Sequence, residues 1–253
     1  MSLFTHTCGE GPDLVLLHGW GMNGDVWEGL LPTLSQHYRT TIVDLPGHGR
    51  SLDCPRDYSL ANLSAVLADV MPAQASLVGW SLGGMLATQF TLDHPQRIHK
   101  LALVASAPKF VRDSDWAEGV EPDVLDGFAA GLRQDFQQTI RRFIAIQAMG
   151  SEHARDQQRS LRERVFRHGN PQPAALEGGL NILRQADLRP RLAEIRCPSL
   201  LLVGEHDALF RRRAAEQTLE LLPQANLTLI PGAGHAPFLS HPAIFLAALQ
   251  AFL

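Results

Sequence analysis

Long apolar runs are missing from this sequence of 253 residues, although 45% of the residues are hydrophobic. No run approaches the ~20 consecutive apolar residues that a membrane-spanning helix requires. Residues 1–6 contain neither the basic segment nor the apolar segment of a secretory signal peptide. We therefore expect a cytoplasmic protein without a membrane partner.

Cysteine is scarce as well. The three cysteines, Cys8, Cys54 and Cys197, are an odd number with unrelated spacings and no CxxC pair. Such a set argues against a disulfide framework and fits the reducing cytoplasm. We interpret none of the three as a nucleophile.

Lysine is nearly absent, because only Lys100 and Lys109 occur among the 22 basic residues and the others are all arginines. The formal net charge of −4 argues against a general nucleic-acid-binding protein. Eight arginines nevertheless fall between Arg133 and Arg167, against four acidic residues. This arginine window has a net charge of +4, which leaves −8 for the rest of the chain. The window therefore requires an explanation of its own.

Six short runs rich in leucine or β-branched residues end in glycine or turn residues. Their apolar residues are nearly continuous rather than alternating, which is typical of strands covered on both faces. Helical patterns, such as those at residues 60–71 and 84–94, separate most of the runs. This alternation predicts an α/β domain with a mostly parallel central sheet flanked by helices. The predicted strands lie at residues 14–17, 40–43, 76–78, 101–104, 200–203 and 227–230.

The alternation stops between residues 111 and 187, where helical patterns follow one another. One amphipathic stripe has steps of three and four residues, which predicts a helix; its members are Phe128, Leu132, Phe136, Ile140, Phe143 and Ile144. Arg155, Arg159 and Arg162 repeat a helical spacing further along, and two prolines precede a third helical segment at residues 174–183. We predict a helical lid over residues 111–187, inserted into a core formed by residues 1–110 and 188–253. An insertion at the carboxyl ends of parallel strands lies where such sheets hold their sites.

Gly79-Trp80-Ser81-Leu82-Gly83 is a G-x-S-x-G motif between a predicted strand and a predicted helix. Its glycines permit a sharp turn that exposes the serine, and the helix N-terminus favours negative charge there. The alternative interpretation is a glycine-rich turn without chemistry. The strand–turn–helix context favours Ser81 as a catalytic nucleophile.

A serine hydroxyl is a poor nucleophile, so it needs a base, and the base needs an orienting carboxylate. His235 follows the last predicted strand, among small residues that leave its imidazole free to turn toward Ser81. Asp207 closely follows the preceding strand and is the predicted carboxylate. Glu205 and His206 are local alternatives to Asp207.

These three residues occur in the order serine, aspartate, histidine, which is the order of the α/β-hydrolase triad. The sequence resembles the α/β-hydrolase superfamily over essentially its whole length. The resemblance implies the α/β-hydrolase fold, with the backbone N–H groups of Trp20 and Leu82 as the oxyanion hole and His18 in a structural role. Trp20 and Trp80 are candidate walls of an acyl pocket, with core packing as the alternative. The resemblance is carried by Leu17-His18-Gly19-Trp20-Gly21, residues 44–51, the Ser81 turn, Asp207 and His235.

Within the superfamily, the sequence is similar to the pimeloyl-[acyl-carrier-protein] methyl ester esterases of biotin synthesis. The matching stretches are residues 16–23, 43–47, 79–84, 104–108, 121–125, 142–150, 178–183 and 235–238. The similarity within the lid is the most informative, because lid sequences diverge fastest among enzymes of this fold that have different activities. It implies hydrolysis of the methyl ester of a carrier-bound pimeloyl chain, with release of methanol and with no metal or organic cofactor. The implied substrate-binding residues are Trp20, Ser81, Leu82, Phe143, Ile144, Ala145, Ile146, Gln147 and His235.

The resemblance also suggests a role for the arginine window. Acyl carrier proteins are strongly acidic, and arginine suits carboxylate and phosphate partners. A local patch can steer an acidic partner even when the total charge is negative. We therefore predict that an acyl carrier protein docks on the lid, with an ordinary solvated helix face as the alternative. The candidate docking residues are Arg141, Arg142, Arg155 and Arg159.

Other functions stay open at this stage. One is a broad-specificity carboxylesterase that acts on small, short-chain esters without a carrier partner. Another is a non-catalytic protein that binds a small ligand, because this fold hosts many functions. Thioesterases and carbon–carbon bond hydrolases share the triad, and its spacing does not separate them. The protein is expected to act as a monomer.

Overall fold

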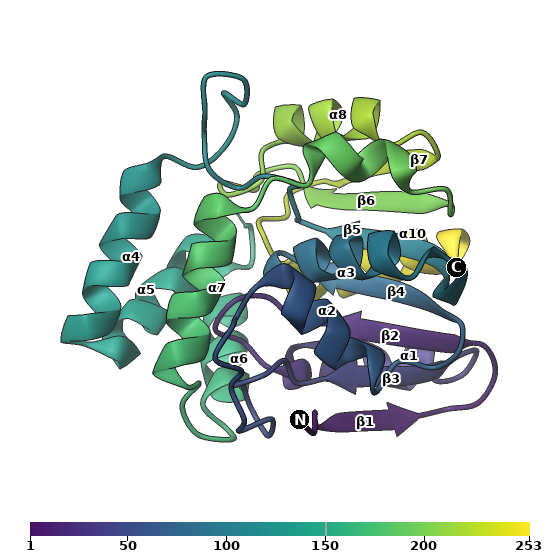
Figure 1. Cartoon of the computed structure of the whole chain (residues 1–253), viewed down its shortest axis with the longest axis horizontal. Helices are drawn as coiled ribbons and strands as arrows, with labels where there is room; N and C mark the ends of the chain where they lie inside the picture. Colours follow the sequence, from purple (N-terminus) through teal and green to yellow (C-terminus); the bar gives the residue numbers. More distant parts are fainter. Residues whose placement is uncertain (150) are drawn as a thin grey trace.

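The computed structural model describes residues 1–149 and 151–253. Gly150, which ends one of the stretches similar to the esterases, lies outside the described residues, and so does the side chain of Arg133. Within the described part, seven strands form one sheet with helices on both faces (Figure 1). Helices α2 (Leu60–Ala68) and α3 (Leu82–Asp93) cover one face, and α10 (Pro242–Phe252) lies behind the strands (Figure 1).

The strand order in the sheet is β1-β3-β2-β4-β5-β6-β7, and each neighbouring pair is parallel except β1 with β3. Each of the six predicted runs lies within one of the strands β2 to β7, so the predicted α/β architecture is confirmed. The sequence analysis missed β1, a short edge strand whose partly exposed residues form no apolar run. The strands are β1 Thr5–Cys8, β2 Asp13–Leu17, β3 Arg39–Val43, β4 Ala75–Trp80, β5 Ile98–Val104, β6 Ser199–Gly204 and β7 Ala225–Ile230.

Four helices between β5 and β6 stand beside the carboxyl ends of the parallel strands (Figure 1). They are α4 Pro122–Gln134, α5 Phe136–Gln147, α6 Ala154–Val165 and α7 Pro173–Gln185. The stripe predicted as one helix is in fact two, because Asp135 interrupts it. The Asp135 carboxylate accepts a hydrogen bond from the Gln138 N–H at 2.9 Å and caps the start of α5. The boundaries of the lid at residues 111 and 187 stay a prediction.

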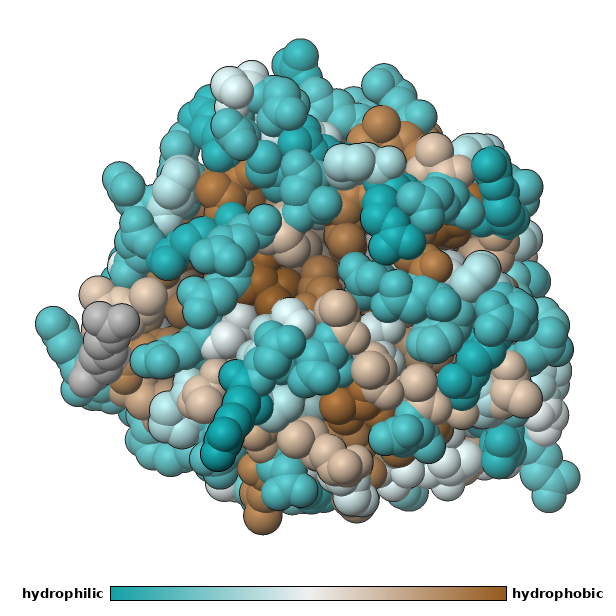
Figure 2. All heavy atoms as spheres, viewed as in Figure 1, coloured by the Kyte–Doolittle hydropathy of each residue, from teal (hydrophilic) through white to brown (hydrophobic). Residues whose placement is uncertain are grey.

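The remaining elements belong to the core. Short helical turns lie between the strands, at η1 Gly24–Leu30, α1 Leu31–Leu34, η2 Pro95–Arg97 and η3 Arg189–Glu194, and α9 Pro237–Ser240 follows the last strand. Helix α8 Arg212–Leu221 connects β6 to β7. Side chains on the face shown in Figure 2 are largely hydrophilic, and hydrophobic atoms are visible in hollows between them. Within the described residues, no helix combines the length and the apolar character needed to cross a membrane.

Polar contacts join the end of α6 to the loop that follows β2. The Asn23 Nδ2 donates a hydrogen bond to the carbonyl oxygen of Arg164 at 3.0 Å. The buried carboxylate of Asp25 lies 2.8 Å from the guanidinium of Arg167 in the segment after α6. Asp25 also pairs with Arg50 of the core at 2.8 Å, so one carboxylate links the lid to the core.

The turn from β4 into α3 depends on glycines that pack without side chains. A Cβ atom on Gly79 would lie 2.3 Å from the backbone oxygen of Gly83, and one on Gly83 would lie 2.4 Å from the backbone oxygen of His18. A Cβ on Gly84 would lie 2.4 Å from the side chain of Ser106. The backbones of β4, α3 and the loop after β2 therefore pack against each other with no room for a side chain between them.

Two buried histidines hold the loop that follows β3. His18 accepts a hydrogen bond from the Leu45 N–H through Nε2 at 2.9 Å, so its proton is on Nδ1, which donates to the Gly19 carbonyl at 2.8 Å. The His48 ring lies 5.3 Å from the His18 ring, and its Nδ1 donates to the Pro46 carbonyl at 3.0 Å. Burial lowers the pKa of His18, and burial together with the nearby His18 lowers the pKa of His48 to about 3. Both imidazoles are therefore neutral near pH 7.

Substituting alanine for Gly79 tests the close packing of the turn. Because the added methyl carbon would lie 2.3 Å from rigid backbone, we expect Gly79→Ala to lower the free energy of unfolding by about 1–3 kcal/mol. The matched control is Gly29→Ala, since no atom lies within 4 Å of its added carbon, and we expect a change within about 0.5 kcal/mol. Urea denaturation measures both, and equal effects would contradict the packing argument.

The buried His48 predicts a specific loss of stability in acid. The unfolded chain protonates this histidine below about pH 6.5, whereas the folded chain does so only near pH 3, so its contribution is lost as the pH falls through this range. Between pH 7 and pH 5, the free energy of unfolding of the wild type should fall by about 2 kcal/mol more than that of His48→Gln. Urea denaturation at both pH values measures the difference. The exposed His99→Gln should retain the wild-type pH dependence, and a His48→Gln profile equal to wild type would refute the prediction.

Candidate active site

Ser81 lies in the sharp turn between β4 and α3, in a backbone conformation that side chains rarely adopt. Its φ is 55° and its ψ is −119°. The turn is held from both sides, because the Ser81 N–H donates to the Val104 carbonyl at 2.9 Å and the Ser106 hydroxyl donates to the Ser81 carbonyl at 2.7 Å. Such strain costs on the order of 1–3 kcal/mol and persists only where the surrounding structure fixes the backbone. This conformation is the one that the G-x-S-x-G motif requires.

His235 and Asp207 form a buried pair at the ends of the last two strands. The Nδ1 of His235 lies 3.0 and 2.9 Å from the two carboxylate oxygens of Asp207. The Asp207 carboxylate also accepts hydrogen bonds from the N–H groups of Leu209 and Phe210 at 2.8 and 2.9 Å, which fixes its orientation. A carboxylate beside Nδ1 places the imidazole proton there and leaves the lone pair on Nε2. Nε2 is buried and has no hydrogen-bond partner among the described residues, so it is free to accept a proton.

Of the three adjacent candidates for the carboxylate position, Asp207 is the one that contacts His235. The Glu205 carboxylate instead accepts a hydrogen bond from the Gly232 N–H at 3.3 Å. The backbone N–H of His206 donates to the Ala233 carbonyl at 2.9 Å. All three residues follow β6, and the turn directs the side chain of Asp207 toward the imidazole.

His235 is also bonded to the residue beside Ser81. The indole N–H of Trp80 donates to the His235 carbonyl at 2.8 Å, and the centroids of the two rings are 6.0 Å apart. The His235 N–H donates to the carbonyl of Gln147, the last residue of α5, at 3.1 Å. The imidazole is therefore placed beside the Ser81 turn by one contact from the core and one from the lid.

The two predicted oxyanion donors lie next to Ser81. Leu82 is the first residue of α3, whose N-terminal N–H groups have no partner within the helix. A Cβ on Gly19, the residue before Trp20, would lie 3.3 Å from the Cβ of Ser81. Neither the Trp20 nor the Leu82 N–H donates a hydrogen bond within the described part of the chain, so both are available. His18, by contrast, uses both ring nitrogens in hydrogen bonds.

Helix α5 brings part of the predicted substrate-binding segment to the site. The ring of Phe143 packs edge-on against Trp20 at 4.8 Å, and the indole N–H of Trp20 donates to the Leu176 carbonyl of α7 at 2.8 Å. Phe143, Ile144 and Gln147 are buried, and the Oε1 of Gln147 has no hydrogen-bond partner among the described residues. Ala145 and Ile146 are half-buried and line separate surface grooves, with Ile146 in an apolar groove that includes Leu209.

The four predicted docking arginines are exposed, but they do not line one groove. Arg141 and Arg142 of α5 line a groove of about 610 Å³ together with Arg162 of α6. Arg159 lines a second groove and pairs with Asp156 at 3.0 Å. Arg155 is exposed one turn earlier on α6.

The sequence alone did not identify two residues that contact these sites, Ser106 beside Ser81 and Arg162 beside Arg141 and Arg142. The Ser106 hydroxyl holds the Ser81 carbonyl, and its only sequence signal is its position just after β5. Arg162 lies in the same groove as Arg141 and Arg142, and its signal is the helical repeat that it shares with Arg155 and Arg159.

Known proteins similar to this chain identify its family. A family model described as alpha/beta hydrolase fold matches residues 12–242. The pimeloyl-[acyl-carrier protein] methyl ester esterase of Aeromonas hydrophila is 47% identical over 254 residues, which cover 100% of each chain. The protein of the same name in Nitrosomonas europaea is 44% identical over 250 residues, which cover 99% of each chain.

Solved structures show the same fold. An esterase from Exiguobacterium antarcticum matches with a TM-score of 0.89 and 25% sequence identity, covering 99% of this chain and 94% of the esterase. A bromoperoxidase from Bacillus anthracis matches with a TM-score of 0.90 and 22% identity, covering 99% of this chain and 94% of that protein. The chain therefore belongs to the α/β-hydrolase fold family and, within it, to the family of the pimeloyl-[acyl-carrier protein] methyl ester esterases.

Proposed function

We propose that this chain is a serine carboxylesterase that hydrolyses the methyl ester of pimeloyl-acyl-carrier protein in biotin biosynthesis, releasing pimeloyl-acyl-carrier protein and methanol. The observation that carries the proposal is the buried His235–Asp207 pair beside the strained Ser81 turn. The relatives that share 44–47% of the sequence over their full length are named for this reaction.

The geometry supports a two-step mechanism. Ser81 Oγ attacks the ester carbonyl while His235 Nε2 takes the hydroxyl proton, and Asp207 stabilises the resulting imidazolium through Nδ1–H. The N–H groups of Trp20 and Leu82 hold the oxyanion, and the start of α3 adds favourable electrostatic potential. The intermediate collapses, and methanol leaves with the proton from His235. Water, activated by His235, then cleaves the acyl-enzyme to the free carboxylate and restores Ser81.

The substrate-binding roles follow the two faces of α5. Phe143 and Gln147 lie on the buried face and contact Trp20 and the His235 backbone. We assign this face, together with Ile144, to the acyl chain near the reacting ester. Ala145 and Ile146 lie at surface grooves, which suits the outer part of the carrier's prosthetic arm.

The arginines on the outer face of the lid support docking of the acidic carrier. Arg141, Arg142 and Arg162 converge on one groove and carry no ion pair with a carboxylate among the described residues, so their charges are available to a partner. Ala145 lines the same groove, which connects the docking surface with the predicted substrate segment. Arg155 and Arg159 extend the positive surface along α6.

The proposal includes a cytoplasmic, monomeric enzyme that uses no cofactor and binds no nucleic acid. Its three cysteines are free thiols in the structure, which suits a reducing compartment. Apart from substrate and water, every step above uses only side chains and backbone groups of this chain.

The catalytic assignment predicts the effect of two substitutions. We expect Ser81→Ala to lower kcat by a factor of about 10⁶, and Asp207→Asn to lower it by about 10⁴ because the imidazole loses its orienting carboxylate. The measurement is release of methanol from methyl-pimeloyl-carrier protein, with loss of one CH₂ in the mass of the carrier. Ser114→Ala and Asp69→Asn make the same changes at exposed positions, so these control variants should retain wild-type activity. Wild-type protein that cleaves a small methyl ester but leaves the carrier-bound ester intact would instead indicate the broad carboxylesterase.

If the carrier docks on these arginines, reversing their charge should lower kcat/KM for the carrier-bound substrate, and the size of this effect should depend on the salt concentration. The double variant Arg142→Glu and Arg159→Glu should lower kcat/KM for the carrier-bound ester about tenfold or more at low ionic strength, because steering is lost. Turnover of a small free ester should stay at the wild-type level. Arg196→Glu is the control, since Arg196 is exposed just before β6, at the opposite end of the strands from the lid. Equal losses on both substrates would contradict docking at these arginines.

A further inference from the structure

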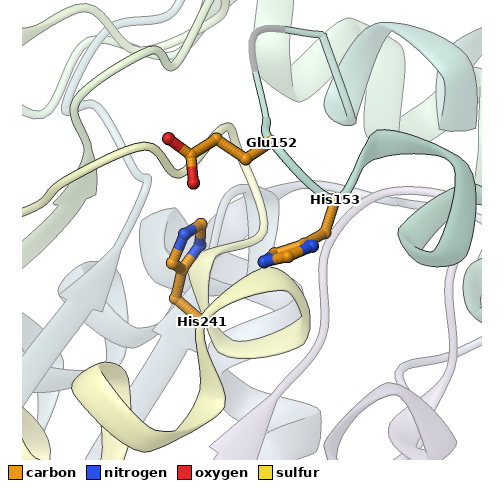
Figure 3. A group of neighbouring side chains, drawn as sticks. All are labelled: Glu152, His153 and His241. Atoms are coloured by element: carbon orange, nitrogen blue, oxygen red, sulfur yellow. The ribbon is translucent and has the colours of Figure 1, made fainter.

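Glu152, His153 and His241 gather where the lid meets the core (Figure 3). Glu152 and His153 lie in the turn between α5 and α6, whereas His241 connects α9 to α10. One possible ligand atom from each side chain lies within 4.8 Å of the other two. Figure 3 shows the Glu152 carboxylate facing the His241 ring and the His153 ring directed toward it. None of these residues takes part in the mechanism proposed for Ser81 and His235.

Hydrogen bonds leave one nitrogen of His241 free for a ligand. The Ser240 hydroxyl oxygen lies 2.9 Å from Nδ1 of His241 and 3.4 Å from the Ala236 carbonyl oxygen. In the tautomer with the proton on Nδ1, this hydroxyl accepts the hydrogen bond from Nδ1–H and donates to Ala236, and Nε2 keeps its lone pair for a ligand. A hydroxyl or carbonyl that holds the other ring nitrogen is the usual support of a metal-binding histidine.

The other two side chains are also available. Glu152 makes no ion pair with a basic residue among those described, although it lies within the arginine window. Its backbone is fixed, because the Glu152 N–H donates to the Gly232 carbonyl at 3.2 Å. The His153 ring lies 5.4 Å from the His241 ring, and no hydrogen bond to another described residue occupies it. Glu152 and His153 are exposed and His241 is half-buried, so an ion has access from solvent.

We propose that Glu152, His153 and His241 bind a divalent transition-metal ion of the zinc class. Two imidazoles and one carboxylate are a favourable donor set for such ions, and a water molecule completes a tetrahedron. Ligand atoms around a tetrahedral ion with bonds of about 2.1 Å lie about 3.4 Å apart. The ligand atoms lie within 4.8 Å of one another, so binding requires the side chains to shorten these separations by up to about 1.4 Å.

The bound ion would connect the lid to the core at a point close to the base. The segment that ends α5 and begins α6 is already bonded to the loop of His235, through Gln147 with His235 and through Glu152 with Gly232. The metal adds a link from this segment to the junction of α9 and α10. The ion therefore stabilises the packing of the lid on the core and takes no part in ester hydrolysis.

Titration of the metal-free protein with Zn²⁺ tests the site. Isothermal calorimetry should show one ion bound per chain, and Co²⁺ should give the absorption bands of a tetrahedral complex. Removing one of three ligands, in His153→Gln or His241→Gln, should raise the dissociation constant about tenfold or more. Ser240→Ala should weaken binding to a smaller extent, because the tautomer of His241 is no longer held. The exposed His99→Gln is the matched control and should bind as the wild type does.

The thermal midpoint gives an independent readout, because an ion that binds only the folded chain raises it. Zn²⁺ should raise the midpoint of the wild type and of His99→Gln, and at the same Zn²⁺ concentration it should raise that of His241→Gln less. Hydrolysis of a small ester by each variant shows that the variant is folded. Absence of binding to the wild type, or binding that persists unchanged in His153→Gln and His241→Gln, would overturn the proposal. Zn²⁺ that binds His235 instead would inhibit all variants alike, which also rejects the site.

Discussion

The left-handed backbone of Ser81 is the constraint on which the rest of the site depends. A serine with φ near 55° is stable only where its neighbours leave no alternative, and the neighbours here are the backbone of β5, which accepts its N–H, and the Ser106 hydroxyl, which donates to its carbonyl. Gly83 approaches the His18 carbonyl so closely that a single methyl group would not fit. The turn, the first residue of α3 and the loop that carries Trp20 therefore form one rigid unit. This unit holds the free N–H groups of Trp20 and Leu82 beside the Ser81 turn, which is the preorganised arrangement that the proposed oxyanion hole requires.

The lid is part of the site as well as its cover. The carbonyl of Gln147 in α5 accepts the hydrogen bond from the His235 N–H, and the carbonyl of Leu176 in α7 accepts that from the Trp20 indole. A displacement of either helix thus removes a hydrogen bond from a residue assigned to catalysis. The contacts of Asp25 with Arg50 and Arg167 hold the end of α6 in a different way, through one buried carboxylate that pairs with two partly exposed guanidinium groups.

The sheet and the order of the triad could be predicted because each depends on a local signal. Strands buried on both faces need continuous apolar runs, and residues that follow parallel strands meet at one edge. The misses have physical reasons too. The edge strand Thr5–Cys8 is half exposed and needs no such run. Asp135 leaves the apolar stripe in phase on both sides, so the break appears only in the structure, in the extended backbone of Asp135 and in its capping hydrogen bond. Asp207, by contrast, was predicted over Glu205 and does contact His235, although no spacing encodes the directions of these two side chains within one turn.

The arginine window shows how one helix meets two opposite requirements. Phe143 and Arg141 are two residues apart on α5, and at 3.6 residues per turn they point about 160° away from each other. The apolar side is buried against Trp20 while the charged side faces solvent. The window, residues 133–167, carries +4 and the remainder of the chain −8, so an acidic partner is attracted to the window and repelled by the rest of the chain, the other lid residues included. Repulsion from the wrong surface contributes to orientation as much as attraction to the right one. In the proposed docking, the negative charge of the rest of the chain, which argued against nucleic acid at the outset, would direct an acidic carrier to the arginine window.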